Sequence, residues 1–296
     1  MTLADDLKKR QRNVYSQHGE DGIVEWIVSR IGPGSKTCVE FGAWDGRNLS
    51  NTFNLVAHHG WKAVYIEADP EKFSALRKTA EAYPGITPVQ SLVTSSGETA
   101  LDAVLRRSGV PEEFDILSID IDGNDYDVWE ASARYRPRLV IVEFNATFPR
   151  GFSYVDRGGR GFIGSSAAAF AALAARKGYG LLGRTETNLF FLRDECFPAL
   201  GVAPQAVEDV LDGNAICYAF LNYAGEIVFS NEAVARRLRG VSYAEPLKTL
   251  ARRLSGAPTF YLLGEAHASG GAMLKFLRRL AAIGRGRRDA PVDAAR

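Results

Sequence analysis

The sequence predicts an α/β protein with a doubly wound, mostly parallel, seven-stranded Rossmann-like sheet and a mixed, largely helical C-terminal extension. Three observations predict this fold. Short, β-rich apolar runs alternate with helix-period segments from residue 36 to about 193. The runs are continuously apolar, as in parallel strands that helices cover on both faces. The last two runs follow one another closely, which is typical of an antiparallel hairpin that closes one sheet edge.

The elements follow in chain order. We expect five parallel strands at 37–41, 63–67, 86–90, 114–119 and 138–143, then a hairpin of 179–184 and 188–193. Helical patterns lie near 19–31, 48–58, 70–82, 97–108, 124–134 and 165–177. A second hairpin is expected in ICYAFLNYAGEIVFS, and 231–283 is mostly helical in pattern. We therefore expect one domain over 1–193 and an extension over 194–296, which packs on the core or forms an oligomer contact.

Composition excludes several classes of protein. Apolar residues make up 46% and charged residues 24% of the chain, enough to build a sizeable core. Lys and Arg number 36 against 35 for Asp and Glu, so no basic excess points to nucleic acid. The three cysteines form no CxxC pair, which argues against a zinc knuckle and fits reduced thiols. The first residues have no signal-peptide pattern and no apolar run reaches membrane-spanning length. We expect a soluble, cytoplasmic protein.

The C-terminal tail departs from this balance. Residues 275–296 contain seven Lys or Arg and two Asp. Such a tail is either a solvated helix or a basic amphipathic surface with weak affinity for an anionic membrane or a charged glycan carrier.

The most informative stretch is CVEFGAWDGRNLSNT, where a buried strand runs into Gly42 and a helix is expected near Asn48. Ligands of open α/β sheets bind at the carboxyl ends of the strands. A dinucleotide fingerprint counted from Gly42 requires glycines at 44 and 47, but this chain has Trp44 and Arg47. A tryptophan in place of the second glycine is expected to exclude a pyrophosphate.

A ligand without phosphates, with an amino acid end and a nucleoside end, suits this loop better. Glu40 and Asp45 can attract an ammonium group, and the Gly42 backbone can approach the ligand. Glu67 lies 21 residues after Gly46, at the end of the second strand, where it can bind a ribose diol. The alternative is an ordinary tight turn with two solvated acids.

Two other glycine patterns do not compete with this loop. GRGFIG, at 159–164, matches GxGxxG, but a polar segment precedes it where a buried strand is required, so we interpret it as a lid or substrate loop. The sequence has no GxxxxGK[ST] motif, which excludes a P-loop.

Five blocks resemble one protein family in order and spacing. They are SQHGEDGI, VEFGAWDGRNLSNT, GWKAVYIEADPEKF, SIDIDGNDYDVWEA and PRLVIVEFN, and the chain resembles FkbM-type S-adenosylmethionine (SAM)-dependent methyltransferases over about 15–193. The resemblance implies a class I methyltransferase fold and transfer of a methyl group from SAM to hydroxyls of sugars, in polysaccharide or natural-product assembly. The family signature DxEGxE is replaced here by Asp122-Gly123-Asn124-Asp125, and residues past 194 lie outside the resemblance.

The predicted cofactor site gathers residues that follow the first four strands or precede the first helix. They are Gln17, Glu40, Gly42, Asp45, Gly46, Asn51, Glu67, Asp69, Leu92 and Asp120. Asn51 either contacts the cofactor carboxylate or satisfies the first amides of the following helix.

A sugar hydroxyl is a poor nucleophile at neutral pH and needs a base or a metal. Asp120, Asp122, Glu143 and Asn145 follow two neighbouring strands, so their oxygen atoms can converge on one point. Such ligands suit Mg²⁺ or Mn²⁺ (or Ca²⁺) rather than zinc. In the alternative, Asp120 orients cofactor or loop while Asp122 and Asp125 cap the next helix.

The candidate catalytic residues are therefore His18, Asp122 and Glu143. A histidine side chain is the usual choice for a base at neutral pH, although a lone surface histidine is equally compatible with the pattern around His18. We assign His58 and His59, at a helix end, a structural role.

Two further hypotheses remain open at this point. One is a methyltransferase acting on nitrogen or on a small non-sugar molecule. The other is a domain that binds SAM or carbohydrate without turnover, which the acidic and glycine residues after the first two strands argue against.

Overall fold

The computed structural model describes residues 2–32, 34–121, 123–157, 164–211, 219–221 and 227–229. They form two compact units: Met1–Ala146 with Arg150–Leu211, and Thr147–Pro149 with Asp212–Arg296. The first unit extends to Leu211 and leaves out Thr147–Pro149. The second contains a hairpin of β8 (Ala219–Leu221) and β9 (Ile227–Phe229), within the segment where a second hairpin was expected.

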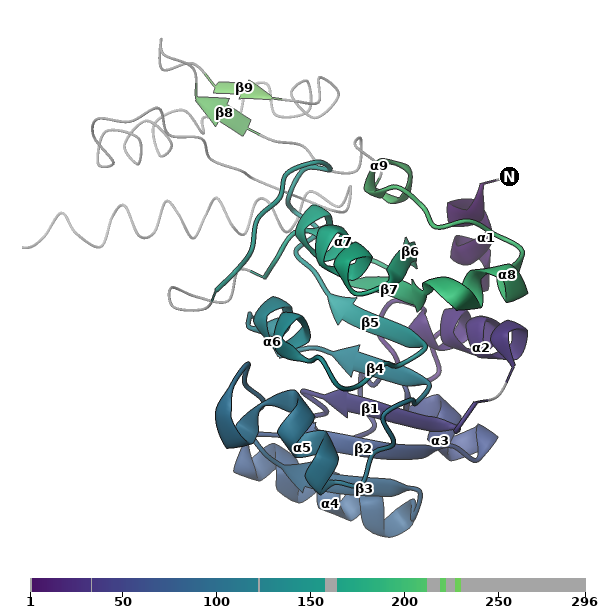
Figure 1. The fold of residues 1–296 in the computed structure, drawn as a ribbon, viewed down its shortest axis with the longest axis vertical. Helices are drawn as coiled ribbons and strands as arrows, with labels where there is room; N and C mark the ends of the chain where they lie inside the picture. The colour runs from purple at the N-terminus through teal and green to yellow at the C-terminus, as the bar shows by residue number, and fades with distance from the viewer. Residues whose placement is uncertain are drawn as a thin grey trace, which may run out of the picture. The chain divides into compact units, whose positions relative to one another are not determined.

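The first unit is built on a seven-stranded sheet in the order β3-β2-β1-β4-β5-β7-β6 (Figure 1). The strands are β1 (Thr37–Phe41), β2 (Lys62–Glu67), β3 (Ile86–Gln90), β4 (Ile116–Ile119), β5 (Leu139–Glu143), β6 (Tyr179–Arg184) and β7 (Asn188–Arg193). The first five are parallel, and β7 pairs antiparallel with both β5 and β6. The predicted doubly wound, mostly parallel sheet is confirmed.

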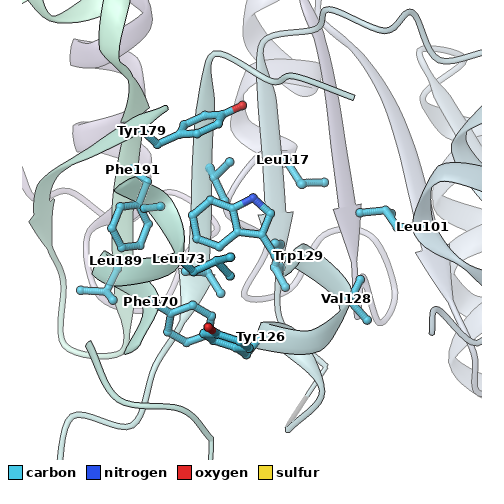
Figure 2. Packing of buried hydrophobic residues seen from close by; sticks show 14 of the residues in the cluster. Leu101, Leu117, Tyr126, Val128, Trp129, Phe170, Leu173, Tyr179, Leu189 and Phe191 are labelled. Atoms are coloured by element: carbon cyan, nitrogen blue, oxygen red, sulfur yellow. The ribbon is translucent and has the colours of Figure 1, made fainter. Parts of the chain in front are cut away.

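Helices cover both faces of this sheet, as its continuously apolar strands require. One face carries α5 (Leu101–Arg107), α6 (Asp125–Ala131) and α7 (Ala167–Arg176). Their core centres on Trp129, whose ring packs 5.3 Å from Phe191 and 6.0 Å from Tyr179 between centroids (Figure 2). The other face carries α1 (Leu3–Arg10), α2 (Glu20–Ile31), α3 (Phe53–His59), α4 (Pro70–Ala82) and α8 (Phe197–Leu200). Short helices η1 (Gly97–Thr99), η2 (Asp194–Cys196) and α9 (Val207–Val210) complete the unit.

Two helices differ from expectation. The sequence pattern did not predict α1, which begins with a capping box between Thr2 and Asp5 and buries Leu7. The helix expected at 48–58 begins only at Phe53. Its start is delayed because Leu49 has a left-handed backbone (φ 59°) and the Ser50 hydroxyl accepts hydrogen bonds from the amides of Thr52 and Phe53.

No helix within the described residues combines the length and the apolar character that crossing a membrane requires.

Candidate functional site

A cavity of about 380 Å³ opens at the carboxyl ends of the parallel strands. Its lining comes from the ends of β1, β2, β4 and β5, the residues after β3, and the start of β7. Eight of the predicted site residues line it: Gln17, Glu40, Gly42, Asn51, Glu67, Leu92, Asp120 and Glu143. The strands therefore gather at one place residues that are up to 126 positions apart in the sequence.

Gly42 shapes the cavity through its backbone. Its φ is 76°, and a Cβ atom added to it would overlap the carbonyl oxygen of Asp120 at the end of β4. A glycine is thus needed for two strand ends to lie close together, as well as for the approach of a ligand.

Gly46 and Asp45 stabilise the loop after β1 but do not line the cavity. A Cβ atom on Gly46 (φ 74°) would overlap Leu76 of α4. The Asp45 carboxylate accepts hydrogen bonds from the amides of Arg47 and Asn48, at 3.0 and 2.8 Å. The contacts of both residues are those of a tight turn, which is the alternative interpretation given above for Asp45.

Glu67 presents a fixed carboxylate at the end of β2. Its Oε2 accepts the Trp44 amide and its Oε1 the Asp69 amide, both at 2.8 Å, and the residue is 6% exposed. An ionised carboxylate has about four acceptor positions, so it can still bind two hydroxyls. Asp69 itself caps α4 by accepting the amides of Glu71 and Lys72, which lowers its carboxyl pKa, and it does not line the cavity.

Glu40 is a buried carboxyl at the end of β1. Its Oε2 accepts hydrogen bonds from the hydroxyls of Thr52, at 2.6 Å, and Ser50, at 3.0 Å. Burial raises its pKa to about 7, although these hydrogen bonds act in the opposite direction. A cationic group in the cavity would favour its ionised form.

Large apolar side chains border the same cavity. Trp44, Leu49 and Leu92 are 46%, 49% and 63% exposed, and all three line it. Trp44 and Leu49 both have a positive φ, 48° and 59°, a backbone conformation that residues other than glycine rarely adopt. The Lys72 ammonium lies 5.4 Å from the centre of the Trp44 ring. Exposed apolar groups on a strained loop are typical of a surface that a ligand covers.

Asp120 and Glu143 line the cavity at the ends of β4 and β5, as predicted. The turn after β4 is held by Asp125, which accepts the amides of Ile121 and Gly123 at 2.8 and 2.9 Å. Asp125 therefore stabilises the turn before α6, whereas the alternative interpretation expected it to cap the helix, whose N-cap residue is Asn124. Asp122 lies outside the described residues, so its predicted catalytic role stays a prediction.

The predicted metal set is incomplete in the described part of the chain. No group of three or more His, Cys, Asp or Glu side chains there could hold an ion. Asn145 does not line the cavity, and its backbone N–H donates to the Ser165 carbonyl oxygen at 2.9 Å.

The SQHGED block is part of a loop that hydrogen bonds to Asp21 hold together. The buried Asp21 carboxylate accepts the amides of Val14, Tyr15 and Ser16, each at 2.8 Å. This arrangement places Gln17 in the cavity lining. His18 is not part of the lining; its Nδ1 lies 3.1 Å from a Glu186 carboxylate oxygen.

His58, His59 and Asn51 have local partners. His58 Nε2 is 3.2 Å from the Tyr15 hydroxyl, and His59 Nε2 is 3.2 Å from Glu25. Asn51 donates to the Ser118 hydroxyl at 3.1 Å while lining the cavity.

Sequence reasoning missed several cavity residues. Among them are Lys72 in the first turn of α4, Ser91 beside Leu92, and Thr187 and Asn188 where β7 begins. The hairpin itself was expected, but its antiparallel strand enters the sheet beside β5, and that neighbour could not be read from the order of elements along the chain.

No protein-family model and no curated protein match this sequence. Solved structures resemble parts of the fold. The CMeT domain of the citrinin polyketide synthase matches 59% of this chain and 51% of its own, with 15% identity and a TM-score of 0.40. A SAM-dependent methyltransferase from Aquifex aeolicus matches 64% of this chain and 96% of its own, with 11% identity and a TM-score of 0.37. The N-terminal domain of EvdMO1, solved in the presence of SAH and D-fucose, matches 64% and 91%, with 14% identity and a TM-score of 0.40. This chain thus spans about half the length of the first of these proteins.

Proposed function

We propose that this protein is an SAM-dependent O-methyltransferase of the FkbM type that methylates a hydroxyl of a sugar, glycan or glycosylated natural product in the cytoplasm. The main observation that supports this proposal is the position of Glu67. Its carboxylate is fixed at the end of β2 by two backbone amides and borders a cavity that also contains Leu92 and Glu40. A diol, an apolar base and a cationic amino acid group find matching partners in this set.

The family resemblance gains support from where its blocks meet. Each of the five blocks contributes at least one residue to the cavity: Gln17, Glu40, Glu67, Asp120 and Glu143 in chain order. If these blocks only stabilised the core, we would not expect a residue from each of them to meet at one edge of the sheet.

The charges of the cavity also fit the ligand. Four carboxyl residues line it (Glu40, Glu67, Asp120 and Glu143), and Lys72 is the one Lys or Arg in the described lining. When bound, SAM supplies an electrophilic methyl group on a positively charged sulfonium. An acidic cavity attracts such a ligand, whereas it repels the diphosphate of a dinucleotide.

The chain itself has two tasks in this reaction. The ends of β1, β2 and β3 hold the donor, and the ends of β4 and β5 align the acceptor hydroxyl in line with the methyl group. Glu143 is the base that we assign to the hydroxyl proton, because it lines the cavity while His18 does not.

Thermal unfolding with SAM, S-adenosylhomocysteine (SAH) or NAD tests the proposal. At about 100 times its Kd, a ligand of the folded state adds about 2.7 kcal/mol of stability. We expect SAM and SAH to raise the Tm and NAD to leave it unchanged. Leu92→Asn should weaken SAM binding about fivefold through lost apolar contact, as measured by calorimetry.

Val14→Asn is the matched control, because Val14 is also exposed (37%) but does not line the cavity. Stabilisation by NAD alone, or equal effects of the two variants on SAM affinity, would contradict the proposal.

A further inference from the structure

The part of the cavity beside β5 and β7 is lined by polar residues, and the proposed function does not assign a role to all of them. We call Gln17, Glu143, Thr187 and Asn188 the β5–β7 wall; all four line the cavity. Glu143 and Asn188 are direct partners in the antiparallel pairing of β5 with β7. Three segments of the chain thus meet there.

A buried carboxylate fixes one side of this wall. Glu20, at the start of α2, is fully buried, and its Oε1 accepts hydrogen bonds from the Thr185 hydroxyl at 2.5 Å and from Asn188 Nδ2 at 3.1 Å. Its Oε2 accepts the His18 amide at 2.7 Å. Glu20 therefore ties the SQHGED block to the hairpin that carries Asn188.

This tie determines the orientation of the Asn188 amide. A carboxylate accepts hydrogen bonds and does not donate them, so the NH₂ group must face Glu20 and the oxygen must point elsewhere. Asn188 is 5% exposed, and its Oδ1 has no hydrogen-bond partner in the described part of the chain. Buried polar atoms are nearly always paired, so this oxygen indicates a missing hydrogen-bond donor. The oxygen itself has almost no accessible surface, so a group in the adjoining cavity reaches it once the Asn188 side chain shifts slightly.

The missing hydrogen-bond donor is not the ribose that Glu67 would bind. The sheet order places β1, β4 and β5 between β2 and β7. Four strand spacings of about 4.8 Å each separate the two ends by about 19 Å. The β5–β7 wall therefore lies at the acceptor end of the cavity.

We propose that Asn188 positions the methyl acceptor by accepting a hydrogen bond through Oδ1, and that Glu20 is the residue that holds its amide in this orientation. The inference rests on the proposed function and narrows it: the acceptor carries an O–H or N–H group beside the one that is methylated. An acceptor without such a donor would leave the orphaned oxygen unpaired.

The test measures sugar binding to the full-length protein saturated with SAH, by saturation-transfer NMR titration. The probes are methyl α-D-glucoside and its fully O-methylated derivative, which keeps the ring but has no donor. We expect the glucoside to bind and the methylated sugar to fail. Asn188→Leu should weaken glucoside binding about tenfold with the SAH Kd unchanged, whereas Gln205→Leu, a control outside the cavity, should not.

A double-mutant cycle separates positioning from mere stability. Glu20→Gln should weaken glucoside binding in the wild-type background and have no further effect on it in the Asn188→Leu background. Asn188→Ala replaces Asn188→Leu if the larger side chain prevents folding. Equal binding of the two sugars, no binding of either, or an equal effect of Glu20→Gln in both backgrounds overturns the inference. Failure to bind SAH is a separate result, which overturns the proposed function as well.

Discussion

At the residue scale, side chains of the same type in the cavity differ in their hydrogen-bond partners, and burial shifts the pKa of one of them. Glu40 and Glu67 have the same functional group and similar burial, 6% exposure each. Glu67 accepts two backbone amides, whereas Glu40 accepts two hydroxyls and has its pKa raised to about 7 by burial. We infer different tasks for them: a fixed acceptor for hydroxyls, and a carboxyl that responds to a nearby positive charge.

Glu40 predicts how stability depends on pH. Because its pKa is higher in the folded state (about 7) than its ordinary value of 4.5, the protonated form is favoured by folding. Its stabilising contribution is complete below pH 4.5 and is lost as the pH rises through about 7, by roughly 3 kcal/mol in total. Glu40→Gln should therefore gain unfolding free energy relative to wild type between pH 5 and 8.

Urea unfolding at several pH values measures this difference. Glu81→Gln, an exposed position on α4, is the control and should give a difference that does not change with pH. A Glu40→Gln difference as constant as that of Glu81→Gln would show that Glu40 ionises normally in the folded protein.

At this scale, the sequence predicts which residues lie at the cavity when they stand at a strand end. Glu40, Glu67, Leu92, Asp120 and Glu143 all reach the cavity because parallel strands end at a common edge. Asp45, Gly46 and Asp69 do not line it, because short-range hydrogen bonds and packing against α4 use them in the turn. The sequence pattern does not distinguish a carboxylate that faces a ligand from one that caps a loop.

At the scale of elements, the strands were predicted to within two residues, because continuous apolar runs mark the centre of a parallel sheet. Helix starts were less predictable, since they depend on caps such as Ser50 and on left-handed residues such as Leu49. The α1 helix was missed because its mostly charged sequence places a single residue, Leu7, fully in the core.

Leu7 gives the element-scale prediction. It is 2% exposed, and its Cδ1 occupies the space beside Gly183 on β6. Leu7→Ala should lower the unfolding free energy by about 2–5 kcal/mol, because the cavity that remains cannot fully collapse. Lys8→Ala, an exposed position on the same helix, should change it by less than about 0.5 kcal/mol in the same urea titration. Similar values for the two variants would mean that α1 does not pack on β6 in solution.

At the scale of the whole molecule, all the described residues that line the cavity belong to the first compact unit. We therefore expect a fragment of residues 1–211 to fold and to bind SAH with the affinity of the full chain. Calorimetry on both proteins measures this. A fragment ending at 193 should be less stable, because Phe197 and Val210 are buried in the cores of the same unit. Loss of SAH binding by folded 1–211 would assign the remaining residues a part in the cofactor site.

The tie between Glu20 and the hairpin has a consequence for how the protein is made. Glu20 meets its partners Thr185 and Asn188 across 165 and 168 positions of the chain. A ribosome must therefore have released the chain beyond residue 188 before Thr185 and Asn188 can donate hydrogen bonds to that carboxylate. The nascent chain can bring together the ends of β1, β2 and β3 from contacts within its first hundred residues, whereas the end of the cavity that contains Asn188 can close only after β7 has been synthesised.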